Sequence, residues 1–170
     1  MRRTQFERFG LRGVAWIFVA SEAIVREMGK PGIKAILSAD FNDFTHENAF
    51  WLLMKEGDTY VAAIAARLDD VGRESIQSYM KRILDRQYPT DKGASVASIT
   101  GSLPHDFYGR MVHVGELFVR PNARGSRKRL RQFMWMFHAT AAAKWTIDWS
   151  WAFMKERDVL LGAASFYGFT

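Results

Sequence analysis

The chain has 170 residues, a length that fits one domain of ordinary size, so we predict a single domain over residues 1–170. Apolar residues make up 48% and charged residues 25%, which excludes a disordered chain, while the absence of cysteine excludes a disulfide scaffold, a thiolate nucleophile and a cysteine-bound metal. The net charge is +6, and the segment from Arg120 to Arg131 alone contains six basic residues and no acidic one, so the whole excess of positive charge lies there. Such a dense cluster is typical of a discrete anion site.

The N-terminal part of the chain contains one apolar run and one short helix. Residues 13–20 predict a buried strand or the lead-in to a helix, because the early charges Glu7 and Arg8 and the lack of a cleavage site argue against a signal peptide. Residues 21–28 predict a helix that ends at Gly29. No stretch reaches the roughly 18 apolar residues of a membrane span, so we expect a cytoplasmic protein without a membrane partner.

The middle of the chain predicts a hairpin, a helix and a long loop. A hairpin is predicted over 51–67, because two apolar runs, 49–54 and 60–66, flank Gly57, and a glycine in such a gap favours a tight reversal between antiparallel strands. Residues 73–84 carry apolar side chains three and four positions apart, which indicates a helix. Residues 88–109 are rich in glycine, proline and serine, and they predict a long loop with one short strand at 94–100.

The last third predicts a strand, a helix and a second strand. The apolar run 111–119 has strand length and stops before Pro121, and helical spacing then continues to Lys144. Residues 146–153 alternate between apolar and polar side chains, which is the pattern of a strand. A strand–helix–strand crossover makes its two strands parallel. A shorter helix is predicted over 156–164.

The turn between the first of these strands and the helix carries the chemistry of the sequence. It has the sequence VRPNARGSRKRL from Val119 to Leu130. At the start of a helix, free backbone N–H groups and the positive end of the helix dipole point to one place, and guanidinium groups match phosphate oxygens. Gly125 would let the backbone approach an anion closely. A phosphate-binding loop is therefore predicted here, and a solvated basic helix start is the alternative.

This stretch resembles the signature of the GNAT acyltransferase superfamily, in which a strand is followed by V-x-P-x-x-R-G-x-G-x-G and a helix. The residues that match in register are Val119, Pro121, Arg124 and Gly125. The resemblance covers the layout of residues 50–170, including the hairpin and the Gly-Phe pair at 168–169. It implies an α+β fold with a mixed, mostly antiparallel sheet of five or six strands, helices on both faces and a parallel strand–helix–strand unit near the C-terminus.

The resemblance implies an acyltransferase that moves an acetyl or other acyl group from acyl-CoA to an amine by direct attack. The loop binds the CoA pyrophosphate in the family, and the implied cofactor-binding residues are Phe118, Val119, Arg124, Gly125, Ser126, Arg127, Lys128 and Arg129. Glu116, on the strand before the loop, is the candidate general base, and Tyr167 is the candidate acid for the leaving thiolate. The alternative for Glu116 is pairing with an arginine or exposure to solvent.

The chain departs from the family pattern at three places. Arg127 and Arg129 stand where the signature has its second and third glycines, so they could obstruct the backbone cradle or turn outward and hold phosphates by charge. The tyrosine position of many members is Ala164 here, with Tyr167 three residues further on. The sequence stops at Thr170, so it could be a shortened relative or a fragment, with an open sheet edge that a second copy in a homodimer could cover.

The histidines and the remaining carboxylates add little chemistry. No two of the four histidines have a spacing typical of metal ligands, so no metal is predicted. His138 lies in an apolar helix and is expected to be a core histidine, and Asp148 is expected to be structural. Simple alternation along the strand places His113 on the face opposite to Glu116.

The acceptor amine would belong to a small molecule, a protein or an aminoacyl-tRNA, and two other classes of function stay open. A catalytically silent relative would keep the fold and bind CoA, a peptide or a partner through the basic loop. A nucleic-acid-binding module would contact phosphates through residues 120–131. The near-neutral remainder of the chain and the absence of a reader motif argue against nucleic acid.

Overall fold

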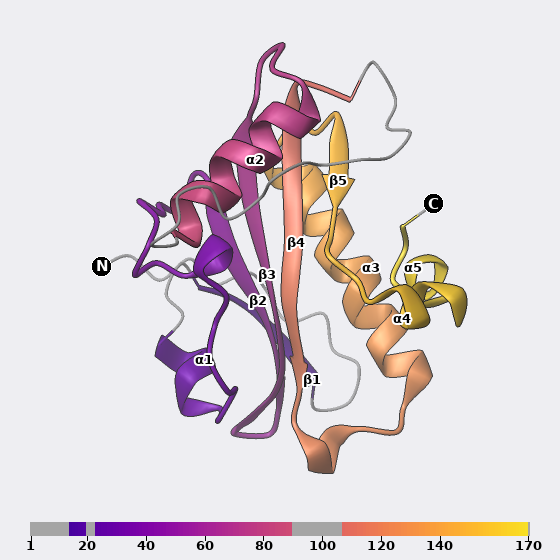
Figure 1. Cartoon of the computed structure of the whole chain (residues 1–170). Coiled ribbons are helices and arrows are strands. Elements are labelled where there is room, and N and C mark those ends of the chain that lie inside the picture. Colours follow the sequence, from indigo (N-terminus) through magenta and orange to yellow (C-terminus); the bar gives the residue numbers. More distant parts are fainter. Residues whose placement is uncertain (1–13, 20–22, 90–106, 170) are drawn as a thin grey trace.

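The computed structural model, which describes residues 14–19, 23–89 and 107–169, contains one sheet with the strand order β1-β2-β3-β4-β5 (Figure 1). The strands are β1 Val14–Val19, β2 Ala49–Glu56, β3 Thr59–Asp70, β4 Arg110–Val119 and β5 Trp149–Trp151. The first four strands pair antiparallel, and β5 pairs parallel to β4. The predicted mixed, mostly antiparallel sheet and the parallel crossover are therefore confirmed.

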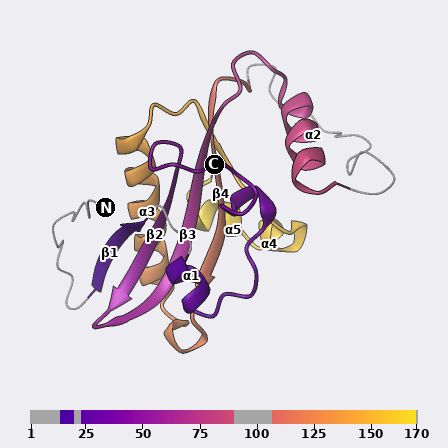
Figure 2. The same cartoon turned by 90° about the vertical axis from the view of Figure 1, so that its left-hand side faces the viewer.

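The helical segments fill the two sides of this sheet. They are α1 Ala23–Glu27, α2 Ile76–Gln87, α3 Arg127–Lys144, α4 Glu156–Leu160 and α5 Ala163–Phe166, with the 3-10 turns η1 Ala35–Leu37 and η2 Pro121–Ala123. Helices α1 and α2 lie on one face and α3 on the other (Figures 1 and 2). This confirms the prediction of helices on both faces.

Each face has its own hydrophobic cluster. On the α1/α2 face, Tyr79 and Ile83 of α2 pack with strand residues such as Trp51 and Met111. On the α3 face, Phe133 and Phe137 pack with Phe50, Leu52 and Ile64. Every residue from Val61 to Ala66 is buried because β3 is covered on both sides. The helix predicted at 73–84 begins at Ile76, where the Ser75 hydroxyl accepts a hydrogen bond from the Ser78 N–H.

The polypeptide leaves β3 and returns to β4 at a single point. The Val71 N–H donates to the Gly109 carbonyl, and the Gly109 N–H donates to the Gly72 carbonyl, both at 2.9 Å. Gly109 has φ of 94°, and a Cβ there would lie 2.4 Å from Asp148 Oδ2. The same carboxylate oxygen accepts from the Arg110 N–H at 2.8 Å, so Asp148 joins the starts of β4 and β5 as a structural residue.

The C-terminal elements differ from the predicted ones in extent. The strand predicted at 146–153 contains only β5, because its pairing with β4 ends at Trp151. The helix predicted at 156–164 is two helices, since Gly162 between α4 and α5 adopts φ of 82°. The run 13–20 contains a strand, β1. The short strand predicted at 94–100 lies outside the described residues.

Helix α3 offers a direct test of the packing. Phe137→Ala removes a fully buried ring that lies 5.5 Å from the Phe50 ring, centroid to centroid, so we expect the free energy of unfolding to fall by about 3–5 kcal/mol. Urea unfolding measures this change. Trp135→Ala, two residues away and 57% exposed, is the matched control and should cost less than about 1 kcal/mol. Equal losses in the two variants would contradict the packing described here.

Candidate active site

A β-bulge in β4 shapes the centre of the candidate site. Gly115 pairs with Ala65 and Phe118 pairs with Ala63, so two residues of β4 stand opposite one residue of β3. Glu116, in the bulge, has φ of 59°, which makes it the non-glycine residue with a positive φ in the described part of the chain. A Cβ at Gly115 would lie 2.6 Å from Leu37 Cδ1, so the close approach of η1 requires a glycine.

The bulge corrects one prediction about the side chains of β4. Alternation alone places His113 and Glu116 on opposite faces, but the extra residue shifts the pattern by one. Both side chains therefore face the α1/α2 side, where Glu116 contacts Lys30 next to α1. His113 lies beside Gly115 and stacks on Trp151 of β5, with ring centroids 4.0 Å apart.

Glu116 forms a buried ion pair with Lys30. Lys30 Nζ donates to Glu116 Oε2 and, at 2.8 Å, to the Gly32 carbonyl. The exposed fraction of the side chain is 11% for Lys30 and 3% for Glu116. The carboxylate is thus paired, although with a lysine and not with an arginine. The two residues are 86 positions apart, and no local pattern in the sequence indicates their contact.

Strands β4 and β5 pair over only three residues. Met111, Val112 and His113 pair with β5, whereas β4 continues to Val119. Within the described residues, the edge of β4 from 114 to 119 that faces β5 has no strand partner, and its backbone groups are available to a ligand. In Figure 1, β5 accompanies only the upper half of β4 before the chain turns into α4.

The basic loop, residues 120–131, joins the end of β4 to α3. Arg124 Nε donates to the Val119 carbonyl at 3.2 Å, which folds the loop back on the strand. Gly125 has φ of 114°, and a Cβ there would have no heavy atom within 4 Å. Ser126 caps the 18-residue helix α3 by accepting a hydrogen bond from the Arg129 N–H at 3.2 Å. The loop therefore presents a capped helix start to open space.

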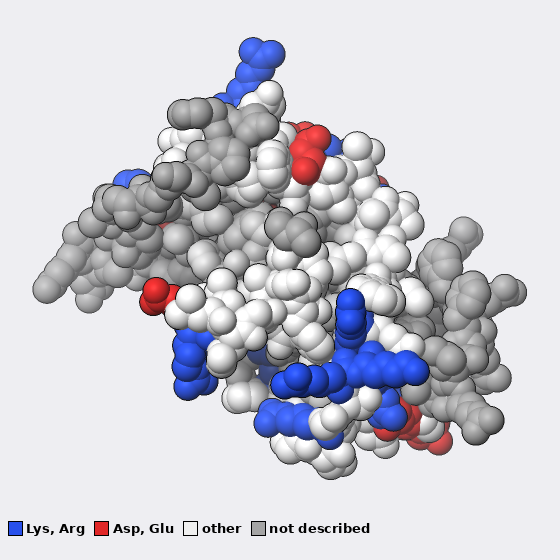
Figure 3. Space-filling model, turned by 90° about the vertical axis from the view of Figure 1, so that its right-hand side faces the viewer, with Lys and Arg blue, Asp and Glu red and all other residues white. Residues whose placement is uncertain are grey.

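The basic side chains in the first turn of α3 differ in whether they have an acidic partner. Arg129 forms an ion pair with Glu56 of β2, which turns its side chain away from the loop. Arg127 and Lys128 are exposed in the first turn of α3, which contains no acidic residue. Figure 3 shows Lys and Arg side chains gathered on the lower part of this side of the molecule, at the level where α3 begins in Figure 1. The first turn thus combines a helix N-terminus with positive side chains.

The remaining predicted site residues lie on both sides of the sheet. Phe118 packs against the α1/α2 cluster and Val119 against the α3 cluster. Tyr167 directly follows α5 and packs against the α3 cluster, so its side chain lies on the face opposite to Glu116. His138 is half-buried, and its Nε2 hydrogen-bonds to the Tyr167 carbonyl at 2.8 Å, so the predicted partner is present although the residue lies at the margin of the core.

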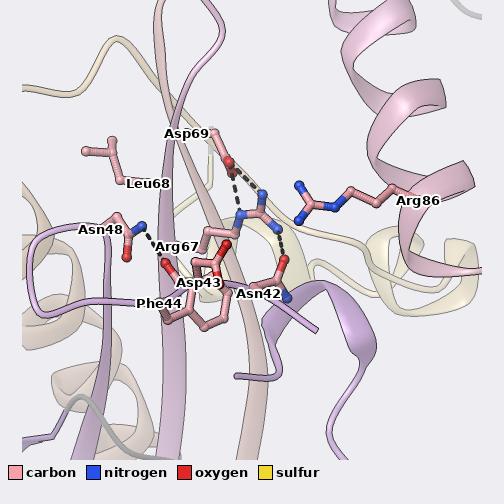
Figure 4. Close-up of a pocket in the computed structure, with 8 residues that line it drawn as sticks. All are labelled: Asn42, Asp43, Phe44, Asn48, Arg67, Leu68, Asp69 and Arg86. Atoms are coloured by element: carbon pink, nitrogen blue, oxygen red, sulfur yellow. Dashed lines mark hydrogen bonds and ion pairs between the residues drawn. The ribbon is translucent and has the colours of Figure 1, made fainter. Parts of the chain in front are cut away.

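A polar cavity of about 160 Å³ lies at the far end of β3 on the α1/α2 side (Figure 4). Its lining residues are Asn42, Asp43, Phe44, Asn48, Arg67, Leu68, Asp69 and Arg86. Arg67 donates to Asp69 Oδ1 and to Asn42 Oδ1, which fixes one wall of the cavity, and Arg86 reaches toward it from α2. The lining comes from three segments distant in the sequence, so only the structure reveals it.

Two absences concern the part of the chain that the structure describes. Residues 23–89 and 107–169 contain no group of three histidine or acidic side chains arranged to hold a metal ion. Over the described elements, each helix is too short or too polar to cross a bilayer.

Comparisons with known proteins place the fold. A GCN5-related N-acetyltransferase from Ralstonia eutropha JMP134 is similar in structure, with a TM-score of 0.50 at 17% sequence identity over 93% of each chain. A predicted acetyltransferase from Clostridium acetobutylicum, solved with acetyl-CoA, has a TM-score of 0.44 at 13% identity, over 92% of this chain and 90% of that one. No protein-family model matches the chain, and no curated protein matches its sequence. The chain has the fold of the GNAT superfamily, as its sequence predicted.

His113 provides a test of the electrostatics at this site. Burial, and to a smaller extent the charges of Arg67 and Lys34, lower the pKa of His113 from 6.5 to about 3. Between these values the unfolded chain binds a proton that the folded chain does not. The titration of His113 therefore does not change the free energy of unfolding above pH 6.5. As the pH falls from 6.5 toward 3, it lowers the free energy of unfolding by at most about 1.4 kcal/mol per pH unit.

We expect His113→Phe, which keeps a ring on Trp151, to flatten the loss of stability on acidification. Urea unfolding at a series of pH values between 4 and about 7 measures this slope. His46→Gln removes an exposed histidine and should leave the slope unchanged. The interpretation is wrong if His113→Phe and the unsubstituted chain lose stability in parallel.

Proposed function

We propose that the chain is an acyl-CoA-dependent N-acyltransferase, which transfers an acetyl or other acyl group to an amine. The observation that carries the proposal is the adjacency of three features: the unpaired edge of β4, Glu116 in its bulge, and the basic helix start at the end of the same strand. A thioester with a long diphosphate-bearing tail needs these three kinds of contact. The GNAT fold supports the same reading.

The start of α3 fits a diphosphate. Arg124, Gly125, Ser126, Arg127 and Lys128 would hold it, through backbone N–H groups, the helix dipole and charge. Space at Gly125 is open, and its positive φ suits glycine alone among common residues. Arg129 would contribute less than the others, because Glu56 already holds its guanidinium group.

The reaction follows from the groups on β4. Glu116 would accept a proton from the attacking amine, since it is a carboxylate beside the unpaired edge of the strand. Backbone N–H groups of β4 beyond the bulge would stabilise the oxyanion, with Phe118 and Val119 forming the wall around the acyl group. Tyr167, on the α3 side, would give a proton to the departing thiolate if the thioester passed between β4 and β5.

A catalytically silent binding protein is the second candidate. One observation favours it: Lys30 occupies the candidate base, so an external amine would have to replace the Lys30 ammonium group. Such a protein would still bind CoA through the start of α3. Binding and turnover measured on the same sample separate these two functions.

Gly125 tests the phosphate site. We expect Gly125→Asp to weaken CoA binding by about tenfold or more, because the added carboxylate would occupy the helix N-terminus and repel the diphosphate. Gly125→Ala is the matched control, since both substitutions strain the same backbone, with φ of 114°, and only one adds charge. Calorimetric titration with CoA gives the affinities. Equal affinities for the two variants would remove this loop from the phosphate site.

Glu116 tests the chemistry separately from binding. We expect Glu116→Gln to lower the rate of thiol release from acetyl-CoA with an amine acceptor by about 10²–10⁴-fold, with CoA affinity retained. Glu74→Gln is the control, because Glu74 also forms an ion pair, with Arg82 on the surface of α2. Unchanged turnover in Glu116→Gln would exclude Glu116 as the general base.

A further inference from the structure

Lys30 is an amine that the fold itself places on the candidate base. Lys30 lies shortly after the end of α1 and directly after Gly29, and its side chain reaches Glu116 in the β4 bulge. A second N–H of the ammonium group donates to the Gly32 carbonyl at 2.8 Å, so the position of Nζ is fixed from two sides. The amine and the carboxylate are therefore held together before any acceptor arrives.

A role in stabilising the fold does not by itself explain the Lys30–Glu116 ion pair. Both side chains are almost entirely buried, and the attraction between buried charges is largely offset by their lost hydration. Glu116 also adopts φ of 59°, a conformation that is strained for a residue with a Cβ. Glycine would form the same bulge without this strain. The structure thus places a carboxylate at a strained position and an amine against it.

We propose that Lys30 is an acyl acceptor within its own chain, so that the protein acylates itself on Lys30 Nζ. This inference rests on the proposed acyl-CoA site at the adjoining edge of β4. It names a substrate, a primary amine on the chain itself, and a modification site. The reaction would run once per molecule, since an acylated Lys30 is neutral and no longer nucleophilic.

The step balances with an acyl thioester as the co-reactant. Glu116 Oε2 takes one proton from the Lys30 ammonium group and passes it to solvent. The neutral Nζ attacks the thioester carbonyl carbon, so that a C–N bond forms and the C–S bond breaks. Sulfur leaves with the electron pair of that bond and takes up the second proton that nitrogen loses. The products are an amide on Lys30 and a free thiol.

The test uses the full chain and acetyl-CoA as the probe. We expect peptide mass spectrometry to find one acetyl group on Lys30, formed at a rate that is independent of protein concentration. Lys34 is the internal control, since it is exposed and four residues away. Uncatalysed acetylation follows exposure and would label Lys34 before the buried Lys30.

Two variants separate the residues. Lys30→Arg keeps the positive charge against Glu116 and should abolish the modification, whereas Lys34→Arg should leave it unchanged. Glu116→Gln should slow labelling of Lys30 by about 10²-fold or more without affecting that of Lys34. Circular dichroism of each variant establishes that it is folded before labelling is compared.

The outcomes distinguish this inference from the proposed function. If acetyl-CoA binds by calorimetry but Lys30 is labelled no faster than Lys34, self-acylation is wrong and the acyl-CoA site stands. Labelling of Lys30 at the same rate in folded Glu116→Gln also overturns the inference. If acetyl-CoA does not bind, the proposed function itself fails, and with it the reaction on Lys30.

Discussion

The extra residue at Gly115–Glu116 controls the geometry around the candidate site. A bulge bends its strand and increases the local twist, so β4 can pair with β3 along its length but with β5 only at its beginning. The same residue reverses the alternation of side chains beyond it and turns Glu116 toward α1. One local irregularity therefore frees a strand edge and aims a carboxylate beside it.

Charge is distributed unevenly around the C-terminal end of β4. On the α1/α2 side, the Lys30–Glu116 pair is buried and neutral as a unit. Directly beyond it, at the C-terminal end of the same strand, the basic loop leads into α3 with exposed cations and without acids in the first turn. Arg129 is neutralised by Glu56, which anchors the helix start to β2 and leaves its neighbours free to meet an anion. Net positive charge is thus concentrated where a diphosphate would lie.

Much of this fold follows from local patterns in the sequence. The apolar spacing of Phe133, Phe137 and Ala141 indicates the buried side of α3, and all three are buried in the structure. The hairpin of β2 and β3 and the parallel pairing of β4 with β5 are equally local, because turn residues and crossover topology determine them. The GNAT-like motif is also a local pattern, and it indicated the loop at the start of α3.

The parts that could not be predicted depend on distant contacts. Glycine inside a strand is a signal for a bulge, so Gly115 could have warned that simple alternation fails at Glu116. Nothing comparable indicates Lys30 as its partner, because the contact depends on how α1 packs on the finished sheet. The same holds for the cavity around Arg67, and for β5, whose pairing with β4 ends at Trp151 although the alternation in its sequence continues to residue 153.

The junction of Gly72 and Gly109 has a consequence for how this chain could vary. Two backbone hydrogen bonds join the end of β3 to the start of β4, so the chain between Gly72 and Gly109 begins and ends at the same place on the sheet. Insertions or deletions between α2 and Gly109 would leave these two hydrogen bonds in place, and the entropy of closing a chain segment between fixed ends grows only slowly with its length. Relatives could therefore remodel this segment extensively while the strands that carry Glu116 and the basic loop stay in register.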